Sequence, residues 1–287
     1  MAEILRGAPV AAALTEKLIE RAERLKARRV TPTLAIVRVG ARADDAAYES
    51  AAVGRCAKVG IAVRRFPLPE DCGAQALLDT IRAVNADDGI HGCLLFRPLP
   101  DRAMERAACA LLAPEKDVDG MTQAALAGVF TGSGAGFPPC TAEACVKLLE
   151  HAGVSLAGKR VAVLGRSLVV GRPVSMLLLQ RDTTVTICHS RTPDAAALCR
   201  AADILIVCAG KAGLVDRTYL RQGQIVLDVG MHEIDGAFCG DVRFSDAVDL
   251  VRAITPVPGG VGAVTTAVLA EHVIEAAART LESADDR

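Results

Sequence analysis

Residues 161–189 read VAVLGRSLVVGRPVSMLLLQRDTTVTICH. The apolar run Val161–Leu164 predicts a strand that ends at Gly165. A helix is expected to begin near Arg172-Pro173, because proline is tolerated in the first turn of a helix. A second strand is predicted over Thr184–Cys188. Backbone N–H groups at such a helix start, together with the helix dipole, favour a phosphate, so the stretch indicates a nucleotide-binding unit rather than a plain βαβ turn.

The turn in this unit differs from the usual dinucleotide fingerprint G-x-G-x-x-G, because it reads G-R-S-x-x-V-G-R-P. The second strand is followed by His189-Ser190-Arg191, without the Asp or Glu that usually accepts from the ribose 2′-OH of NAD. Two arginines, a histidine and a hydroxyl suit a 2′-phosphate, so we expect NADP rather than NAD. The candidate cofactor-binding residues are Gly165, Arg166, Ser167, Gly171, Arg172, Pro173, Ser190 and Arg191.

Composition sets limits on the class of protein. A chain of 287 residues with 51% hydrophobic and 23% charged residues is an ordinary globular sequence, long enough for two domains. The net charge of −1 gives no electrostatic case for binding nucleic acid or an anionic membrane. No apolar run suggests a transmembrane segment, and the N-terminus lacks the layout of a secretory signal. We therefore expect a cytoplasmic protein that binds neither nucleic acid nor membrane.

The ten cysteines are scattered and form no C-x-x-C pair. Several lie in predicted apolar strands, where a free thiol behaves as a small hydrophobic group. We interpret them as reduced and structural, which predicts neither a disulfide framework nor a metal site.

The order of the predicted elements indicates the fold class, α/β, with parallel strands alternating with helices. A Gly/Pro-rich stretch, Thr131–Pro139, marks a boundary between two lobes with a cleft between them. We expect residues 1–138 and the closing helix 266–287 to form a substrate domain, and residues 139–265 a Rossmann-type NADP domain. The predicted strands are Thr33–Val39, Ile61–Phe66, Gly92–Phe96, Val161–Leu164, Thr184–Cys188, Asp203–Cys208 and Gln224–Val229. The predicted helices include Ala43–Val59, Ala74–Val84, Thr141–Ala152 and Thr266 to about Leu281.

An ordered set of motifs now points to a family. The set comprises Tyr48, Pro98-Leu99-Pro100, Lys116–Gly120 (KDVDG), Pro139-Cys140-Thr141, Gly165–Pro173, Cys188–Thr192 and Pro256–Gly262 (PVPGGVG). Over nearly the whole chain it resembles the methylenetetrahydrofolate dehydrogenase/cyclohydrolase family, the bifunctional FolD-type enzymes. The resemblance implies two α/β lobes, NADP on the C-terminal lobe, a tetrahydrofolate derivative as substrate and a homodimer. It also implies oxidation of 5,10-methylenetetrahydrofolate to the 5,10-methenyl form, which water then converts to 10-formyltetrahydrofolate.

The same resemblance implies roles for individual residues. The family aspartate that holds the pterin corresponds to Asp119, and the family tyrosine to Tyr48, so these two are the catalytic candidates; Asp117 is expected to be structural. Met231 falls where the family backbone meets the nicotinamide. The implied substrate-binding positions are Tyr48, Ala52, Leu95, Phe96, Arg97, Asp119, Pro258, Gly259, Gly260, Val261, Gly262 and Thr265.

Two positions depart from the family pattern. The family places its cyclohydrolase lysine one helical turn beyond the tyrosine, where this chain has Ala52, and an assisting glutamine where this chain has Phe96. A milder change gives Gly262-Ala263-Val264-Thr265 in place of Gly-Pro-Met-Thr.

No nearby cation is a convincing replacement for the missing lysine. Lys58 lies ten residues past Tyr48, about 15 Å along a helix. The guanidinium of Arg55 stays protonated and makes a poor base. Arg97 would point away if its strand continued, and Lys116 belongs to a loop motif that the family already has.

We therefore expect hydride transfer to be retained and the cyclohydrolase step to be weak or lost. Three alternatives remain open at this point. The chain could keep both activities by another route, could act on another pterin carrier such as a methanopterin, or could be a silent paralogue that binds NADP or folate. Retention of Tyr48, Asp119 and the complete cofactor motif argues against the silent protein.

Overall fold

The computed structural model describes residues 1–285, except for the side chains at positions 43, 44 and 282–285. The chain forms two compact units: an N-terminal unit, Ala13–Cys140 with Thr266–Arg287, and a C-terminal unit, Met1–Ala12 with Thr141–Thr265. The sequence predicts that residues 1–138 share one domain. The first twelve residues instead belong to the C-terminal unit, because strand β1 (Glu3–Ile4) pairs in parallel with β11 (Ala253–Ile254).

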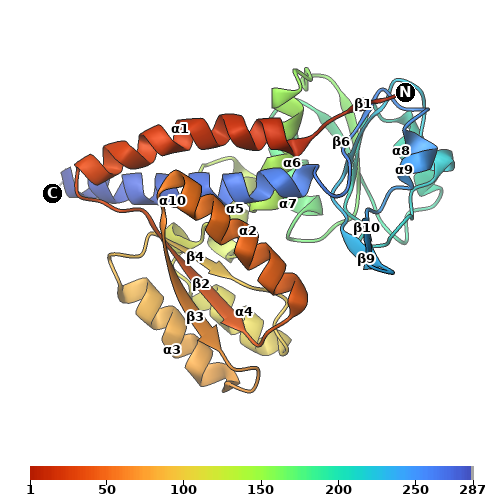
Figure 1. Ribbon diagram of the computed structural model, residues 1–287. Helices are drawn as coiled ribbons and strands as arrows, with labels where there is room; N and C mark the ends of the chain where they lie inside the picture. Colours follow the sequence, from red (N-terminus) through yellow and green to blue (C-terminus); the bar gives the residue numbers. More distant parts are fainter. Residues whose placement is uncertain (286–287) are drawn as a thin grey trace. The chain divides into compact units, whose positions relative to one another are not determined.

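The N-terminal unit is built on a three-stranded parallel sheet in the order β3-β2-β4 (Figure 1). The strands are β2 (Thr33–Val39), β3 (Ala62–Leu68) and β4 (Gly92–Leu95). The central strand β2 reads TLAIVRV and is buried on both faces, as expected for a parallel sheet covered by helices. The helices of this unit include α2 (Ala43–Val59), α3 (Gly73–Ala86), α4 (Arg102–Leu111) and α5 (Gln123–Thr131), together with the short turn η1 (Pro114–Lys116).

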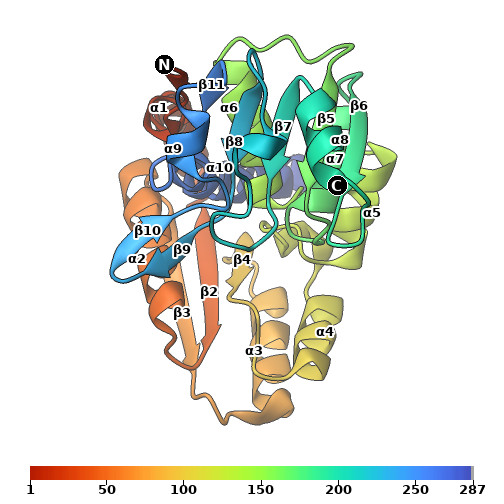
Figure 2. The same ribbon diagram turned by 90° about the vertical axis from the view of Figure 1, so that its right-hand side faces the viewer.

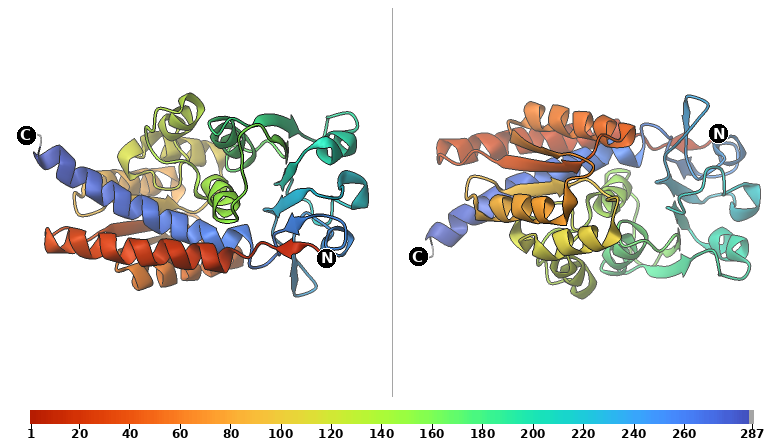
Figure 3. Two further views of the ribbon diagram at one scale, coloured as in Figure 1. Left: turned by 90° about the horizontal axis from the view of Figure 1, so that it is seen from above. Right: turned by 90° about the horizontal axis from the view of Figure 1, so that it is seen from below.

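Two long helices contribute to both units. Helices α1 (Gly7–Ala27) and α10 (Val261–Asp285) run side by side (Figure 3), and in the N-terminal unit Arg21 forms an ion pair with Glu275. By length and composition, Val261–Leu281 could cross a membrane, although no such segment is expected from the sequence. Because 72% of its apolar window is buried inside the protein, we interpret α10 as a core helix.

The C-terminal unit contains a six-stranded parallel sheet in the order β1-β11-β8-β7-β5-β6 (Figure 2). Its core cluster combines alternate residues of the strands, such as Leu164 and Val207, with Cys199 and Ala247 from the helices on that face. The strands are β5 (Arg160–Leu164), β6 (Thr184–Cys188), β7 (Ile204–Val207) and β8 (Ile225–Asp228). The helices are α6 (Cys140–His151), α7 (Gly171–Leu179), α8 (Ala195–Ala201) and α9 (Phe244–Ala247), with the turn η2 (Arg217–Tyr219) and a hairpin of β9 (His232–Ile234) and β10 (Ala237–Cys239).

Candidate functional site

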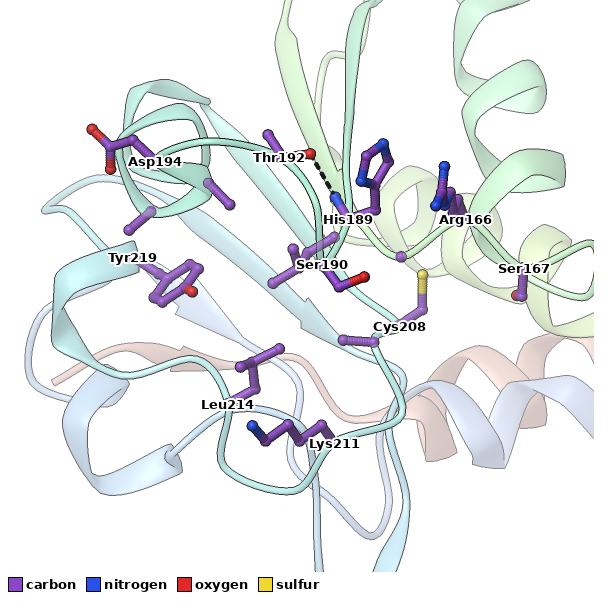
Figure 4. Close-up of a pocket in the computed structure, with 15 residues that line it drawn as sticks. Arg166, Ser167, His189, Ser190, Thr192, Asp194, Cys208, Lys211, Leu214 and Tyr219 are labelled. Carbon is purple, nitrogen blue, oxygen red and sulfur yellow. Dashed lines mark hydrogen bonds between the residues drawn. The ribbon is translucent and has the colours of Figure 1, made fainter.

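A cavity lies at the carboxyl ends of three strands of the C-terminal unit (Figure 4). Leu164, the last residue of β5, is in register with Cys188 of β6 and Val207 of β7. The segments that follow these strands therefore meet at one edge of the sheet, where open α/β sheets bind their ligands. The cavity has a volume of about 700 Å³, within the usual range of small-molecule sites. Its lining residues are Leu164, Gly165, Arg166, Ser167, His189, Ser190, Thr192, Asp194, Ala195, Ala196, Cys208, Ala209, Lys211, Leu214 and Tyr219.

The turn after β5 is closed by glycine and serine. Gly165 has φ +133°, and a Cβ there would overlap the carbonyl oxygen of Cys208. Ser167 braces the turn, because its Oγ accepts from Val170 N at 3.1 Å and its carbonyl accepts from Arg172 N at 3.0 Å. The turn thereby brings its own backbone close to the cavity, which is the usual purpose of glycine in a phosphate-binding loop.

Three basic side chains line the cavity: Arg166, His189 and Lys211 (Figure 4). His189 Nδ1 accepts from Arg191 N at 3.2 Å, so the proton of the neutral imidazole is on Nε2. The carboxylate of Asp194 is occupied at the start of α8, where it accepts from Ala197 N at 3.2 Å. This donor-rich lining fits a phosphorylated ligand.

Only some of the predicted cofactor residues line the cavity. Four of them, Gly165, Arg166, Ser167 and Ser190, line the cavity. Gly171, Arg172 and Pro173 form the first turn of α7, which follows the glycine turn. Arg191 is exposed beyond β6, and the side chain of Met231 is 68% exposed after β8; neither side chain is among the lining residues.

Sequence reasoning missed the contribution of the segment after β7. Ala209, Lys211 and Leu214 line the cavity although no motif marks them. Lys211 lies three residues after the predicted strand Asp203–Cys208, so its position near the carboxyl end of that strand was the available signal.

A second group, which we call the tyrosine cluster, consists of Tyr48, Ala52, Phe96, Arg97 and Asp119 in the N-terminal unit. The Tyr48 and Phe96 rings make an edge contact with centroids 5.9 Å apart. Ala52 lies one helical turn after Tyr48 on α2 and is 1% exposed. Phe96 follows the end of β4, where its backbone N–H donates to Val37 O at 3.0 Å. Leu95, also a predicted substrate position, directs its side chain into the hydrophobic core of the sheet.

The expectation that Arg97 points away holds only if its strand continues to residue 97. Strand β4 ends at Leu95, so the alternation of side chains does not extend to residue 97. Arg97 Nη2 instead lies 3.8 Å from Asp119 Oδ2. Burial raises the pKa of the Asp119 carboxyl, while Arg97 acts against this shift. Burial and the negative charge of Asp119 raise the pKa of Tyr48 well above its ordinary value, so the phenol stays neutral at physiological pH.

Lys116 and Asp117 support the loop that carries Asp119. Lys116 Nζ donates to three backbone carbonyls at the end of α3: Val84 at 2.8 Å, Asn85 at 2.9 Å and Asp87 at 2.8 Å. The Asp117 carboxylate accepts from Met121 N at 3.0 Å and from Thr122 N at 2.7 Å. These contacts agree with the predicted structural role of Asp117, and they occupy the Lys116 ammonium with backbone carbonyls.

The other two cations are also placed apart from the tyrosine cluster. Arg55 Nη1 donates to Thr15 Oγ1 of α1 at 2.6 Å, and Lys58 is exposed at the far end of α2. Neither residue therefore supplies a base beside Tyr48.

The remaining predicted substrate residues, Pro258, Gly259, Gly260, Val261, Gly262 and Thr265, belong to the C-terminal unit. They lead from β11 into the first turns of α10. Gly7 N donates to Gly259 O at 2.9 Å, and Thr265 Oγ1 donates to Val261 O at 3.3 Å. The segment is therefore tied to the start of α1.

Both parts of the chain match one family. Residues 5–119 match the catalytic domain of tetrahydrofolate dehydrogenase/cyclohydrolase, and residues 139–281 match its NAD(P)-binding domain. The bifunctional protein FolD of Clostridioides difficile (strain 630) is 46% identical over 275 residues, covering 96% of both chains.

Solved structures agree with this match. The bifunctional enzyme FolD from Campylobacter jejuni has a TM-score of 0.94 at 34% identity, covering 98% of this chain and 100% of that one. The methylenetetrahydrofolate dehydrogenase-cyclohydrolase of Trypanosoma brucei, complexed with NADP cofactor and inhibitor, has a TM-score of 0.92 at 33% identity, covering 98% of each chain.

Proposed function

Because the chain belongs to the tetrahydrofolate dehydrogenase/cyclohydrolase family, we propose that it oxidises 5,10-methylenetetrahydrofolate with NADP and performs the cyclohydrolase step weakly or not at all. The dehydrogenase activity is supported by the complete cofactor turn and by Tyr48 and Asp119. The weak cyclohydrolase is supported by one observation: Phe96, which contacts the Tyr48 ring, and Ala52, one helical turn after Tyr48, stand where the family places its proton-handling residues.

The cavity of the C-terminal unit fits NADP. Arg166 and Ser190 line it together, and a guanidinium with a hydroxyl suits a 2′-phosphate. Lys211 and the Nε2–H of His189 provide further donors for phosphate oxygens. When bound, NADP supplies the nicotinamide that accepts the hydride.

In the dehydrogenase step the protein mainly binds and orients the substrate. The Asp119 carboxylate accepts hydrogen bonds from the pterin; burial raises the pKa of this carboxyl, and the positive charge of Arg97 opposes the rise and favours the ionised form. Tyr48 stays a neutral phenol, so it offers an O–H donor and a ring edge rather than a base. No proton needs to be moved by the protein while the hydride leaves.

The cyclohydrolase step makes a different demand, because the attacking water must lose a proton. Ala52 and Phe96 have no group that can accept one. Their apolar surfaces also exclude water from the vicinity of Tyr48, which protects the methenyl product. Loss of a general acid or base typically costs about 10²- to 10⁴-fold in rate, so a residual activity is compatible with this proposal.

We also propose that the protein forms a homodimer. Two large apolar side chains on the β9–β10 hairpin, Ile234 and Phe238, are each 51% exposed, which favours a surface covered by a second copy. Light scattering during size-exclusion chromatography should give twice the chain mass. Phe238→Ser should lower the mass towards the monomer, whereas Phe130→Ser, on an exposed side chain of the other unit, should not. A monomeric wild type contradicts the proposal.

The activity is tested by following NADPH and the methenyl intermediate together in one spectroscopic assay with methylenetetrahydrofolate. We expect NADP to be reduced faster than NAD and methenyl to accumulate, disappearing no faster than in buffer. Enzyme-dependent loss of methenyl would instead establish both activities. Binding of NADP and folate without turnover would indicate the silent paralogue, and turnover only with methylenetetrahydromethanopterin would indicate another carrier.

A further inference from the structure

Asp241 joins the cofactor cavity to the hairpin without lining the cavity. Its side chain is fully buried directly after the β9–β10 hairpin. Oδ2 accepts from Ala209 N at 2.7 Å and from Gly210 N at 2.9 Å, while Oδ1 accepts from Lys211 N at 2.9 Å. Oδ1 also lies 2.7 Å from His232 Nε2. Four donors therefore converge on one buried carboxylate.

A second buried carboxylate fixes Asp241 itself. Asp228, at the end of β8, accepts from Asp241 N at 3.0 Å, Val242 N at 2.9 Å and Gly230 N at 3.1 Å. A Cβ at Gly240 would overlap the Asp228 carboxylate, so only glycine fits at this position. The hairpin and the end of β8 are thus locked to the segment after β7.

The segment held by Asp241 forms part of the cavity wall. Ala209 and Lys211 both line the cavity, and both donate their backbone N–H to this carboxylate. The direction of the Lys211 side chain therefore depends on a residue that no ligand in the cavity can reach directly. Figure 4 shows Lys211 on the wall opposite His189 and Arg166.

A carboxylate is needed here for a physical reason. Three consecutive backbone N–H groups point towards one centre, and a charged acceptor forms stronger hydrogen bonds to them than a neutral one. His232 supplies a fourth donor from β9, so the same carboxylate also binds the hairpin. Without the imidazole, Oδ1 loses one of its two donors, so the carboxylate is held less firmly in the orientation that receives the three backbone N–H groups.

We propose that Asp241 and His232 are positioning residues for the cofactor: together they hold residues 209–211 in the shape that binds NADP. The inference rests on the proposed function, because it assigns these residues to the same cofactor cavity. A positioning role of Asp241 and His232 differs from a purely structural role in its effect on the kinetic constants. Loss of either group raises the KM for NADP, while kcat at saturating NADP and the KM for the folate substrate stay close to the wild-type values.

The test uses the full chain with three variants and a matched control. His232→Ala removes the donor to Asp241, His232→Gln supplies an amide donor in its place, and Asp241→Asn replaces the charged acceptor. We expect His232→Ala to raise the KM and Kd for NADP about tenfold and Asp241→Asn about 10- to 100-fold, the range for a lost hydrogen bond to a charged group. His232→Gln should stay within about threefold of the wild type. The control is Asp249→Asn, an exposed aspartate of the same unit.

Each outcome decides the proposal. Thermal unfolding identifies variants that fold; if Asp241→Asn does not, the comparison of His232→Ala with His232→Gln still gives the answer. An unchanged KM for NADP in folded His232→Ala, or equal losses in kcat and in both KM values, overturns the positioning role. If the wild type binds no NADP, the proposed function itself is refuted. If the wild type binds NADP and the variants bind it equally well, only the positioning role is refuted.

Discussion

The ring of Tyr48 meets the ring of Phe96 edge to face, with centroids 5.9 Å apart and planes inclined at 75°. Such aromatic pairs are stabilised beyond the area that they bury. The contact gives Tyr48 an apolar neighbour on the strand side, while Ala52 gives it another on its own helix. Burial raises the pKa of the phenol, and the negative charge of Asp119 raises it further.

Restoring the two polar side chains should restore the cyclohydrolase. We expect the double variant Ala52→Lys with Phe96→Gln to hydrolyse methenyltetrahydrofolate about 100-fold faster than the wild type, within the range for an added general acid or base. The measurement is the enzyme-dependent decay of methenyl absorbance. The dehydrogenase rate should change much less, because it needs no such group.

The control for this gain is Ala57→Lys, which places a lysine on an exposed position of the same helix. It should leave methenyl decay at the wild-type rate. If the double variant folds, reduces NADP and still shows no faster decay, the loss of the two side chains does not explain a weak cyclohydrolase.

Arg166 should determine the choice between NADP and NAD. We expect Arg166→Ala to lower kcat/KM for NADP about 100-fold and to change the value for NAD by less than about threefold, since only NADP carries the 2′-phosphate. The control is Arg160→Ala, at the amino end of the same strand, β5. Equal losses with both cofactors would show that Arg166 contacts another part of the dinucleotide.

Lys116 should matter for stability rather than for chemistry. Lys116→Met removes three hydrogen bonds to backbone carbonyls at the end of α3 and should lower the free energy of unfolding by about 3 kcal/mol. Urea unfolding measures this change, with Lys58→Met on the exposed side of α2 as the control. A stable Lys116→Met with altered methenyl hydrolysis would assign the lysine to catalysis instead.

Asp228 should make stability depend on pH. Burial raises the pKa of its carboxyl from the ordinary 3.8 to about 6. Between these values the folded state binds more protons than the unfolded state, so this group's contribution to stability falls as pH rises. Relative to Asp228→Asn, the cofactor-free wild type should lose about 3 kcal/mol of unfolding free energy between pH 3.5 and pH 7. A difference between the two proteins that does not vary with pH contradicts the raised pKa.

The residue pattern predicted several elements with their bounds, but α10 begins at Val261, five residues before the predicted Thr266. Strands Thr33–Val39 and Thr184–Cys188 and helix Ala43–Val59 have the predicted bounds. The two-residue strands β1 and β11 were missed as a pair, since their pairing joins opposite ends of the chain. That long-range contact also explains why residues 1–12 belong to the C-terminal unit rather than to the predicted first domain.

Some features of the candidate site could be predicted from the sequence, and others could not. Gly165, Arg166, Ser167 and Ser190 could be placed at the cavity because they follow predicted strands within a recognisable motif. The orientation of Arg97 could not, since it depends on where β4 ends and on the position of Asp119. Four donors converge on Asp241 from two other segments of the chain, and nothing in the residues around it indicates this.

The sequence by itself determined the fold class, the cofactor turn and the absence of a lysine and a glutamine at positions 52 and 96, because these are properties of residue type and local order. Only the tertiary structure decided what surrounds each polar group. It placed Lys116 on three carbonyls, Arg97 beside Asp119 and Asp241 beneath the cavity wall. The physical reason is that charge stabilisation depends on distance and burial, and both are set by segments that are far apart in the chain.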